Sequence, residues 1–223
     1  MRAFLEKLEK ANDLLHIDEE LSPRYEVAYV MRELDGGPAI AFYNLRGYSG
    51  RILGNLLSTR RRLAWALGAE EKSVVSKLLE ALKAPLKCAE SSDAPFMEVS
   101  EEPSLTKLPV PTFYERDPGP FITAGVVYAE DPETGVGNLS VHRMMVINDK
   151  HLTIRLVPRH LHRMWQNSKK LGRPLDIAIA IGVPPEVLVA ASLSPPFGVC
   201  EYEVANKLME GRLRLVRCPH VAA

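Results

Sequence analysis

The sequence carries no excess of charge of either sign. Its 28 basic and 28 acidic residues give a formal net charge of zero. Proteins that bind nucleic acid or anionic membranes through charge usually carry a surplus of lysine and arginine. We therefore expect neither nucleic acid nor a charged membrane surface among the partners.

Long apolar runs and cysteines are scarce as well. No stretch approaches the roughly 20 apolar residues that a transmembrane helix requires, and the amino-terminal MRAFLEKLEK is amphipathic and charged rather than signal-like. The three cysteines, Cys88, Cys200 and Cys218, are an odd number without the spacing of a metal site. Because free thiols persist in a reducing compartment, we expect a soluble cytoplasmic protein without a membrane span.

Common signatures of catalysis are missing too. The sequence has no dinucleotide-binding GxGxxG, no P-loop, no GxSxG nucleophile elbow and no HExxH zinc motif. His160 and His162 are two positions apart, so on a helix their side chains point to different faces and cannot chelate one metal together. The histidine pattern by itself therefore predicts no metal site.

Residues 1–100 predict an amino-terminal subdomain in which helices and strands alternate. Apolar periodicity predicts helices over 1–12, 25–34 and 70–82, and strands over 14–17 and 38–45. Ser22 and Pro23 should begin the second helix as its N-cap and first helical residue. The proline-rich segment 101–120 has little periodicity and predicts a boundary, so the second domain is expected over 101–223.

A basic run, Arg60 to Arg62, follows Ser58 and Thr59, either of which can cap a helix. One interpretation of this run is an anion site at a helix N-terminus. The other is a solvated basic turn without a ligand, and the sequence by itself favours the turn.

Beyond the boundary, the pattern predicts mainly strands. Strands are expected over 122–128, 175–181 and 212–218, and helices over 159–171, 184–191 and 201–209. The most informative stretch is a predicted β-hairpin over 137–159, with a turn at Asn148-Asp149-Lys150 and a second strand over 151–157. The period of two places two sets of side chains on opposite faces of its first strand, Asn138, Ser140 and His142 against Leu139, Val141 and Arg143. Polar groups crowd a strand where a core would need apolar ones, so we expect the functional site here.

Several segments in a fixed order carry a family resemblance: GYSGRILGNLLSTRRRLAWALG, then NLSVHR, then CEYEVANKLMEGRLRLVRC. Together they resemble the UbiD family of decarboxylases, which use prenylated flavin mononucleotide (prFMN). The resemblance spans nearly the whole chain. It implies an α+β fold, in which the amino-terminal α/β subdomain is followed by a split β-barrel of flavin-reductase type that is incomplete at its carboxy-terminal end.

The resemblance implies a metal site and a cofactor site. Asn138 and Glu201 match family ligands of a divalent metal, and His160 stands where some members supply a third ligand. Oxygen and imidazole ligands suit Mn²⁺ or Mg²⁺; K⁺ is a further family feature for which no residue here is identified. The implied cofactor contacts are Ser140, Val141, His142, Arg143, Arg155, Leu156, Val157, Arg159 and His160.

Arg143 is the residue expected to act in catalysis. It resembles the family arginine between the substrate carboxylate and the catalytic acids, where a guanidinium can orient the departing carboxylate. The alternative role is a contact with the cofactor phosphate alone. The implied reaction is a non-oxidative, reversible decarboxylation of an α,β-unsaturated or aromatic acid.

The resemblance also implies partners. A flavin prenyltransferase would supply the cofactor, and the full-length form would be a homo-oligomer. His142 stands where many relatives have tyrosine, and the basic run Arg60 to Arg62 leaves room for a phosphorylated unsaturated acid such as anhydromevalonate phosphate. The substrate is thus expected to be a small unsaturated carboxylic acid.

Family members are considerably longer than this chain, and the segment that follows the counterpart of RLRLVRC supplies their proton donor. We therefore expect a carboxy-terminally truncated decarboxylase that lacks this acid. Two alternatives stay open. The chain is either one subunit of a split enzyme whose acids come from another chain, or a flavin-binding or assembly module without turnover.

Overall fold

The computed structural model describes residues 1–92 and 94–218. The chain divides into two compact units, the first of residues 1–71, 102–123 and 143–154, the second of residues 72–101, 124–142 and those from 155 onward. Helices and strands are mixed in both, so the predicted α+β class is confirmed. The domain boundary near residue 100 stays a prediction. No helix in the described ranges has the length and apolar character needed to cross a membrane.

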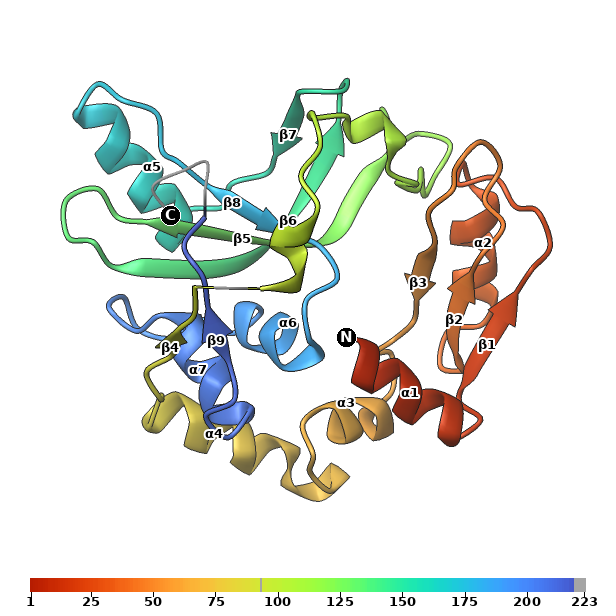
Figure 1. Ribbon diagram of the computed structural model, residues 1–223, viewed down its shortest axis with the longest axis horizontal. Coiled ribbons are helices and arrows are strands. Elements are labelled where there is room, and N and C mark those ends of the chain that lie inside the picture. The colour runs from red at the N-terminus through yellow and green to blue at the C-terminus, as the bar shows by residue number, and fades with distance from the viewer. Residues whose placement is uncertain (93, 219–223) are drawn as a thin grey trace. The chain divides into compact units, whose positions relative to one another are not determined.

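The first unit contains a three-stranded sheet with helices beside it (Figure 1). Its elements are α1 (Arg2–Lys10), β1 (Leu14–Ile17), α2 (Glu26–Glu33), β2 (Ala39–Phe42), β3 (Ile52–Gly54) and α3 (Arg60–Ala66). β2 pairs with β1 in parallel and with β3 antiparallel, and all four of its residues are buried. Val27 of α2 packs with Ile40, Phe42 and Leu45 in the core beside this sheet. The apolar patterns therefore predicted α1, β1, α2 and β2, whereas β3 was not predicted.

The start of α2 differs from the prediction. The helix begins at Glu26 with Tyr25 as N-cap, so the assignment of Ser22 and Pro23 as the cap was wrong. The cause is a backbone bridge: the Pro23 carbonyl accepts from Thr112 N–H at 3.1 Å, and Tyr25 N–H donates to the Thr112 carbonyl at 2.9 Å. These bonds hold residues before Glu26 in an extended path.

One residue of the basic run, Arg62, forms a buried ion pair. Thr59 caps α3 through a bond from Arg62 N–H, as predicted. The Arg62 guanidinium is fully buried and lies 3.2 Å from Asp13 Oδ1, while its Nη2 donates to Ser58 Oγ and the Asn55 carbonyl. A solvated turn is therefore wrong for Arg62. The carboxylate of Asp13 already neutralises the Arg62 guanidinium, so this arginine is not available to bind an external anion.

Replacing Asp13 by asparagine should destabilise the first unit strongly. The change leaves a buried guanidinium without its counter-charge, which typically costs about 3–5 kcal/mol of unfolding free energy. Urea denaturation measures this loss. Arg61→Ala is the matched control: Arg61 bonds to the same carboxylate, but its side chain is 55% exposed, so a loss below about 1 kcal/mol is expected. Equal losses in the two variants would contradict the assignment.

The second unit contains a group of helices around α7 (Glu201–Leu208). α7 packs against α4 (Val74–Lys83) and α6 (Pro185–Ala191) (Figure 1). A 3₁₀ turn, Glu71–Ser73, precedes α4. β4 (Ala89–Glu90) pairs in parallel with β9 (Arg214–Leu215), so the strand expected over 212–218 is only two residues long. Leu213 N–H donates to Asn206 Oδ1 rather than to a strand, which limits the length of this ladder.

The predicted hairpin is present within a four-stranded sheet of order β7-β6-β5-β8. Its strands are β5 (Phe121–Glu130), β6 (Gly137–Val146), β7 (Leu152–Ile154) and β8 (Ala178–Ala180). β6 and β7 are antiparallel, as expected. β7 ends at Ile154, so the extension of this strand to Val157 was wrong. The Arg155 carbonyl bonds to the His142 side chain instead of a strand, and Pro158 has no N–H for a ladder.

The element that follows the hairpin is α5 (His160–Lys170). Asn167 of this helix donates to buried Asp131 at 3.0 Å, which ties α5 to the turn between β5 and β6. Asp131 also accepts the N–H groups of Glu133 and Thr134. These bonds hold the second half of α5 against this turn. The strand expected over 175–181 is shorter and only half-buried as β8.

Candidate functional site

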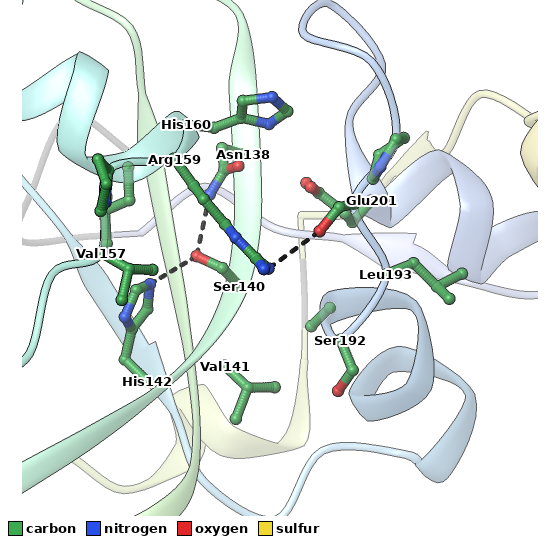
Figure 2. Close-up of a pocket in the computed structure, with 15 residues that line it drawn as sticks. Asn138, Ser140, Val141, His142, Val157, Arg159, His160, Ser192, Leu193 and Glu201 are labelled. Atoms are coloured by element: carbon green, nitrogen blue, oxygen red, sulfur yellow. Dashed lines mark hydrogen bonds between the residues drawn. The ribbon is translucent and has the colours of Figure 1, made fainter.

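A pocket of about 710 Å³ lies in the second unit, where β6 meets the ends of three helices (Figure 2). This volume is typical of sites for cofactors and small molecules. The structure brings eight of the predicted site residues to its wall: Asn138, Ser140, Val141, His142, Val157, Arg159, His160 and Glu201. These residues are distant in the sequence, so the pocket unites segments that the sequence could only suggest separately.

The β6 side of the pocket is a chain of hydrogen bonds. Asn138 Nδ2 donates to Ser140 Oγ at 3.0 Å, Ser140 Oγ lies 2.9 Å from His142 Nε2, and His142 Nδ1 lies 3.2 Å from the Arg155 carbonyl (Figure 2 draws the first two). Asn138, Ser140 and His142 therefore share one face of the strand, as predicted, while Val141, which was expected on the opposite face, also lines the pocket. Burial lowers the pKa of His142 and outweighs the opposing effect of the Arg155 carbonyl, which favours the neutral ring.

Glu201, the first residue of α7, supplies the pocket's carboxylate. Its Oε2 accepts the Leu139 N–H at 2.7 Å, and the residue is only 2% exposed. Burial raises the pKa of Glu201 to about 7, although the bond from Leu139 opposes this shift. The carboxylate is thus held at a fixed place beside β6, and a nearby cation would stabilise its charged form.

The amino-terminal end of α5 forms the third side. Arg159 is the N-cap in an extended conformation, and no side chain caps the first turn, which contains no acidic residue. Arg159 Nη1 donates to Ser194 Oγ at 3.2 Å. Unsatisfied N–H groups and the positive end of the helix dipole favour an anion at such a place. Burial, with the charges of Arg163 and Arg159, lowers the pKa of His160, which favours an imidazole able to bind a metal.

Three predicted residues do not line this pocket. Arg143 is exposed on β6 and its guanidinium lies 5.3 Å from the centre of the Phe121 ring. The Arg155 side chain is exposed, and it is its backbone carbonyl that joins the hydrogen-bond chain. Leu156 is half-buried. The functional roles expected for these residues stay predictions.

Sequence reasoning missed the wall formed by residues 191–195, between α6 and α7. Ser194 holds the Arg159 side chain, and Ser192 lies on the same wall. In the sequence, this segment was no more than a proline-containing loop, because neither serine lies in a recognisable pattern. Only the tertiary contact with α5 identifies it.

The side chains on this pocket offer the kinds of ligand atom that a divalent metal binds. Asn138 Nδ2 is engaged by Ser140, which leaves the amide oxygen for a ligand, and Glu201 Oε1 is the carboxylate oxygen that Leu139 does not use. His160 adds an imidazole on the same pocket. Oxygen donors with one nitrogen suit Mn²⁺ or Mg²⁺. Among the residues that the structure describes, no three His, Cys, Asp or Glu side chains form a cluster, so the asparagine is needed to complete such a site.

Two family models match the chain. Residues 87–223 match the 3-octaprenyl-4-hydroxybenzoate carboxy-lyase Rift-related domain (UbiD), and residues 5–82 match the N-terminal domain of the same carboxy-lyase. The chain therefore belongs to the UbiD family, and the predicted resemblance is confirmed.

Individual relatives agree with this assignment. The chain is 38% identical over 221 residues to the anhydromevalonate phosphate decarboxylase of Methanothermobacter thermautotrophicus, covering 99% of this chain and 51% of the relative. It is 31% identical over 221 residues to the decarboxylase of that name from Aeropyrum pernix, covering 98% and 48%. The chain thus spans about half the length of the curated relatives it matches.

Solved structures show the same relationship. The evolved dimeric form of the UbiD-class enzyme HmfF from Pelotomaculum thermopropionicum, in complex with prFMN, superposes with a TM-score of 0.95 at 36% identity, covering 99% of this chain and 53% of that one. The apo 3,4-dihydroxybenzoic acid decarboxylase AroY from Klebsiella pneumoniae gives a TM-score of 0.86 at 27% identity, covering 99% and 50%. The fold described above is therefore that of a UbiD-class protein.

The raised pKa of Glu201 predicts a pH-dependent stability of the metal-free protein. The folded state holds this proton up to about pH 7, whereas the ordinary pKa of glutamate is 4.5. Stability should therefore fall as pH rises from about 4.5 to 7, by on the order of 3 kcal/mol, and stay level above this window. Urea denaturation at pH 5 and pH 8 measures the fall.

Glu201→Gln should remove this fall, because the amide does not ionise and still accepts the Leu139 N–H. Glu210→Gln, at an exposed glutamate of the same segment, is the control and should keep the wild-type pH dependence. An unchanged pH dependence in Glu201→Gln would show that another group causes it.

Proposed function

We propose that this chain is the cofactor-binding part of a prFMN-dependent decarboxylase whose substrate is a phosphorylated unsaturated carboxylic acid of the anhydromevalonate phosphate class. The substrate class is supported by relatives from Methanothermobacter thermautotrophicus and Methanosarcina mazei, named anhydromevalonate phosphate decarboxylase, at 38% and 33% identity. The cofactor is supported by the HmfF complex with prFMN. The reaction is a non-oxidative, reversible loss of CO₂.

The observation that carries the proposal is the pocket between β6 and α5. It combines a helix N-terminus without a side-chain cap, the Arg159 guanidinium, a buried carboxylate and a strand with small polar groups. A phosphate is favoured by the helix end and the arginine. A flavin ring is favoured by the strand surface, along which Ser140, Val141 and His142 would contact it.

The metal ligands in this proposal are Asn138, Glu201 and His160. They would hold Mn²⁺ or Mg²⁺, which would neutralise Glu201 and bind a cofactor phosphate oxygen. A K⁺ ion is part of the family expectation, and no residue of this chain is assigned to it. When bound, prFMN supplies an electron sink for the decarboxylation.

The remaining steps concern the substrate. Arg143 is proposed to orient the substrate carboxylate, since a guanidinium binds both carboxylate oxygens through paired N–H groups. No residue of this chain is assigned as the general acid, because among the described residues Glu201 is the one carboxylate that lines the pocket, and it is used for the metal. The acid would come from a residue outside these 223.

The chain would act in the cytoplasm, and Cys88, Cys200 and Cys218 are free thiols, as a reducing compartment permits. A flavin prenyltransferase would supply the cofactor, and the whole enzyme would be a homo-oligomer. A dimeric form is known for the evolved HmfF neighbour.

The decisive experiment mixes the purified chain with prFMN, Mn²⁺ and anhydromevalonate phosphate. Flavin should bind, seen by fluorescence quenching, while CO₂ release by the chain alone should be slow because the general acid is missing. Rapid CO₂ release would contradict a missing acid and show that the chain is an enzyme by itself. Absence of flavin binding would overturn the proposal.

Arg159→Ala should weaken FMN binding about tenfold or more and leave riboflavin binding nearly unchanged, because the lost bonds are charge-assisted contacts with phosphate. Titration of flavin fluorescence measures both affinities. Arg173→Ala removes an exposed arginine of the same unit that does not line the pocket and serves as the control. An equal loss for both flavins would argue that Arg159 does not contact the phosphate.

A further inference from the structure

The hydrogen-bond chain on β6 has a definite direction. It runs from the Asn138 amide through Ser140 Oγ and the His142 ring to the backbone carbonyl of Arg155, with donor–acceptor distances of 3.0, 2.9 and 3.2 Å. The carbonyl at its end can only accept. This terminal group therefore decides which atom donates at every preceding step.

The direction follows step by step from the carbonyl. His142 Nδ1 must carry a proton to bond to the Arg155 carbonyl, so Nε2 of the neutral ring is an acceptor. Ser140 must then donate its hydroxyl proton to Nε2. The Ser140 oxygen is left with lone pairs only, and its remaining partner has to be an N–H donor.

That partner is Asn138, whose side chain is buried to 3% exposure. With Nδ2 toward Ser140, the contact is a hydrogen bond; with Oδ1 toward Ser140, two acceptors would face each other without a proton between them. The amide oxygen is therefore turned away from Ser140. Hydrogen-bond chemistry thus selects the same amide orientation as the 3.0 Å contact between Asn138 Nδ2 and Ser140 Oγ.

We propose that Ser140, His142 and the Arg155 carbonyl form a positioning chain that holds the Asn138 amide with Oδ1, rather than Nδ2, available to a divalent cation. The inference rests on the proposed metal site. In it, His142 does not bind the metal but fixes the orientation of Asn138 by way of Ser140. An asparagine can present either edge to a cation, and the Nδ2 edge would repel it. Groups behind a metal ligand commonly orient it in this way. Glu201 is held comparably by the Leu139 N–H.

The first test concerns the chain itself and needs neither metal nor cofactor. Nitrogen-15 NMR of the histidine side chains distinguishes the Nδ1–H from the Nε2–H tautomer. His142 should be the Nδ1–H tautomer at neutral pH, and Ser140→Ala should leave this assignment unchanged, because the Arg155 carbonyl remains. Observation of the Nε2–H tautomer in the wild type would overturn the positioning chain whatever the protein binds.

The second test measures Mn²⁺ binding to the full chain by calorimetry and by electron paramagnetic resonance. His142→Phe retains a ring of similar shape and removes both ring nitrogens, so the Asn138 amide loses its fixed orientation. Mn²⁺ affinity should fall about 10- to 100-fold, and Ser140→Ala should behave alike. His151→Phe, at an exposed histidine in the hairpin turn, is the control and should bind as the wild type does.

A double substitution separates positioning from general damage to the fold. Asn138→Asp has two oxygen edges, so either orientation presents a ligand atom. In this background, His142→Phe should lower Mn²⁺ affinity less than threefold, whereas a structural role would cause the same loss in both backgrounds. Equal losses would overturn the proposal. Absence of Mn²⁺ binding by the wild type, with the Nδ1–H tautomer present, would refute the metal site and its positioning chain while leaving the flavin proposal standing.

Discussion

Asn138, Ser140 and His142 lie on one face of β6, where each polar group depends on the next for its hydrogen bond. Removing such groups from water is costly unless every donor meets an acceptor. The Arg155 carbonyl closes the series, and it is available because β7 ends one residue earlier, at Ile154. The early end of β7 therefore supplies the acceptor that the polar face of β6 needs, and the pocket depends on both.

The other walls are arranged around this face by helix ends. The N-terminus of α5 contributes partial positive charge, and the first residue of α7 contributes a carboxylate. α5 is held in place by the buried Asn167–Asp131 bond, and Glu201 by the Leu139 N–H. Partial positive charge and a carboxylate therefore border the same pocket, which β6 also lines. A dianionic phosphate and a divalent cation are complementary to such an arrangement.

The sequence patterns predicted the helices and strands correctly where interactions between residues close in the sequence decide the structure. β1 spans the predicted 14–17, the N-cap of α3 and the start of α6 agree closely, and Asn138, Ser140 and His142 share one face of β6 as expected. Long-range contacts decided the exceptions. Thr112 keeps the residues before Glu26 extended, and no pattern within that segment signals this partner. Arg62 resembled a surface residue because its counter-charge, Asp13, is distant in the sequence.

The sequence by itself determined the family, the α+β class and the polar strand on which the site is built, because motif order and side-chain alternation are properties of the chain. It also predicted Asn138, Glu201 and Arg159 as residues of the site. Only the tertiary structure decided that these three share a pocket while Arg143 does not line it, and that Ser194 belongs to the wall. It also set the direction of the hydrogen bonds behind Asn138. These outcomes depend on which distant backbone groups meet a side chain, and that is settled by packing rather than by local pattern.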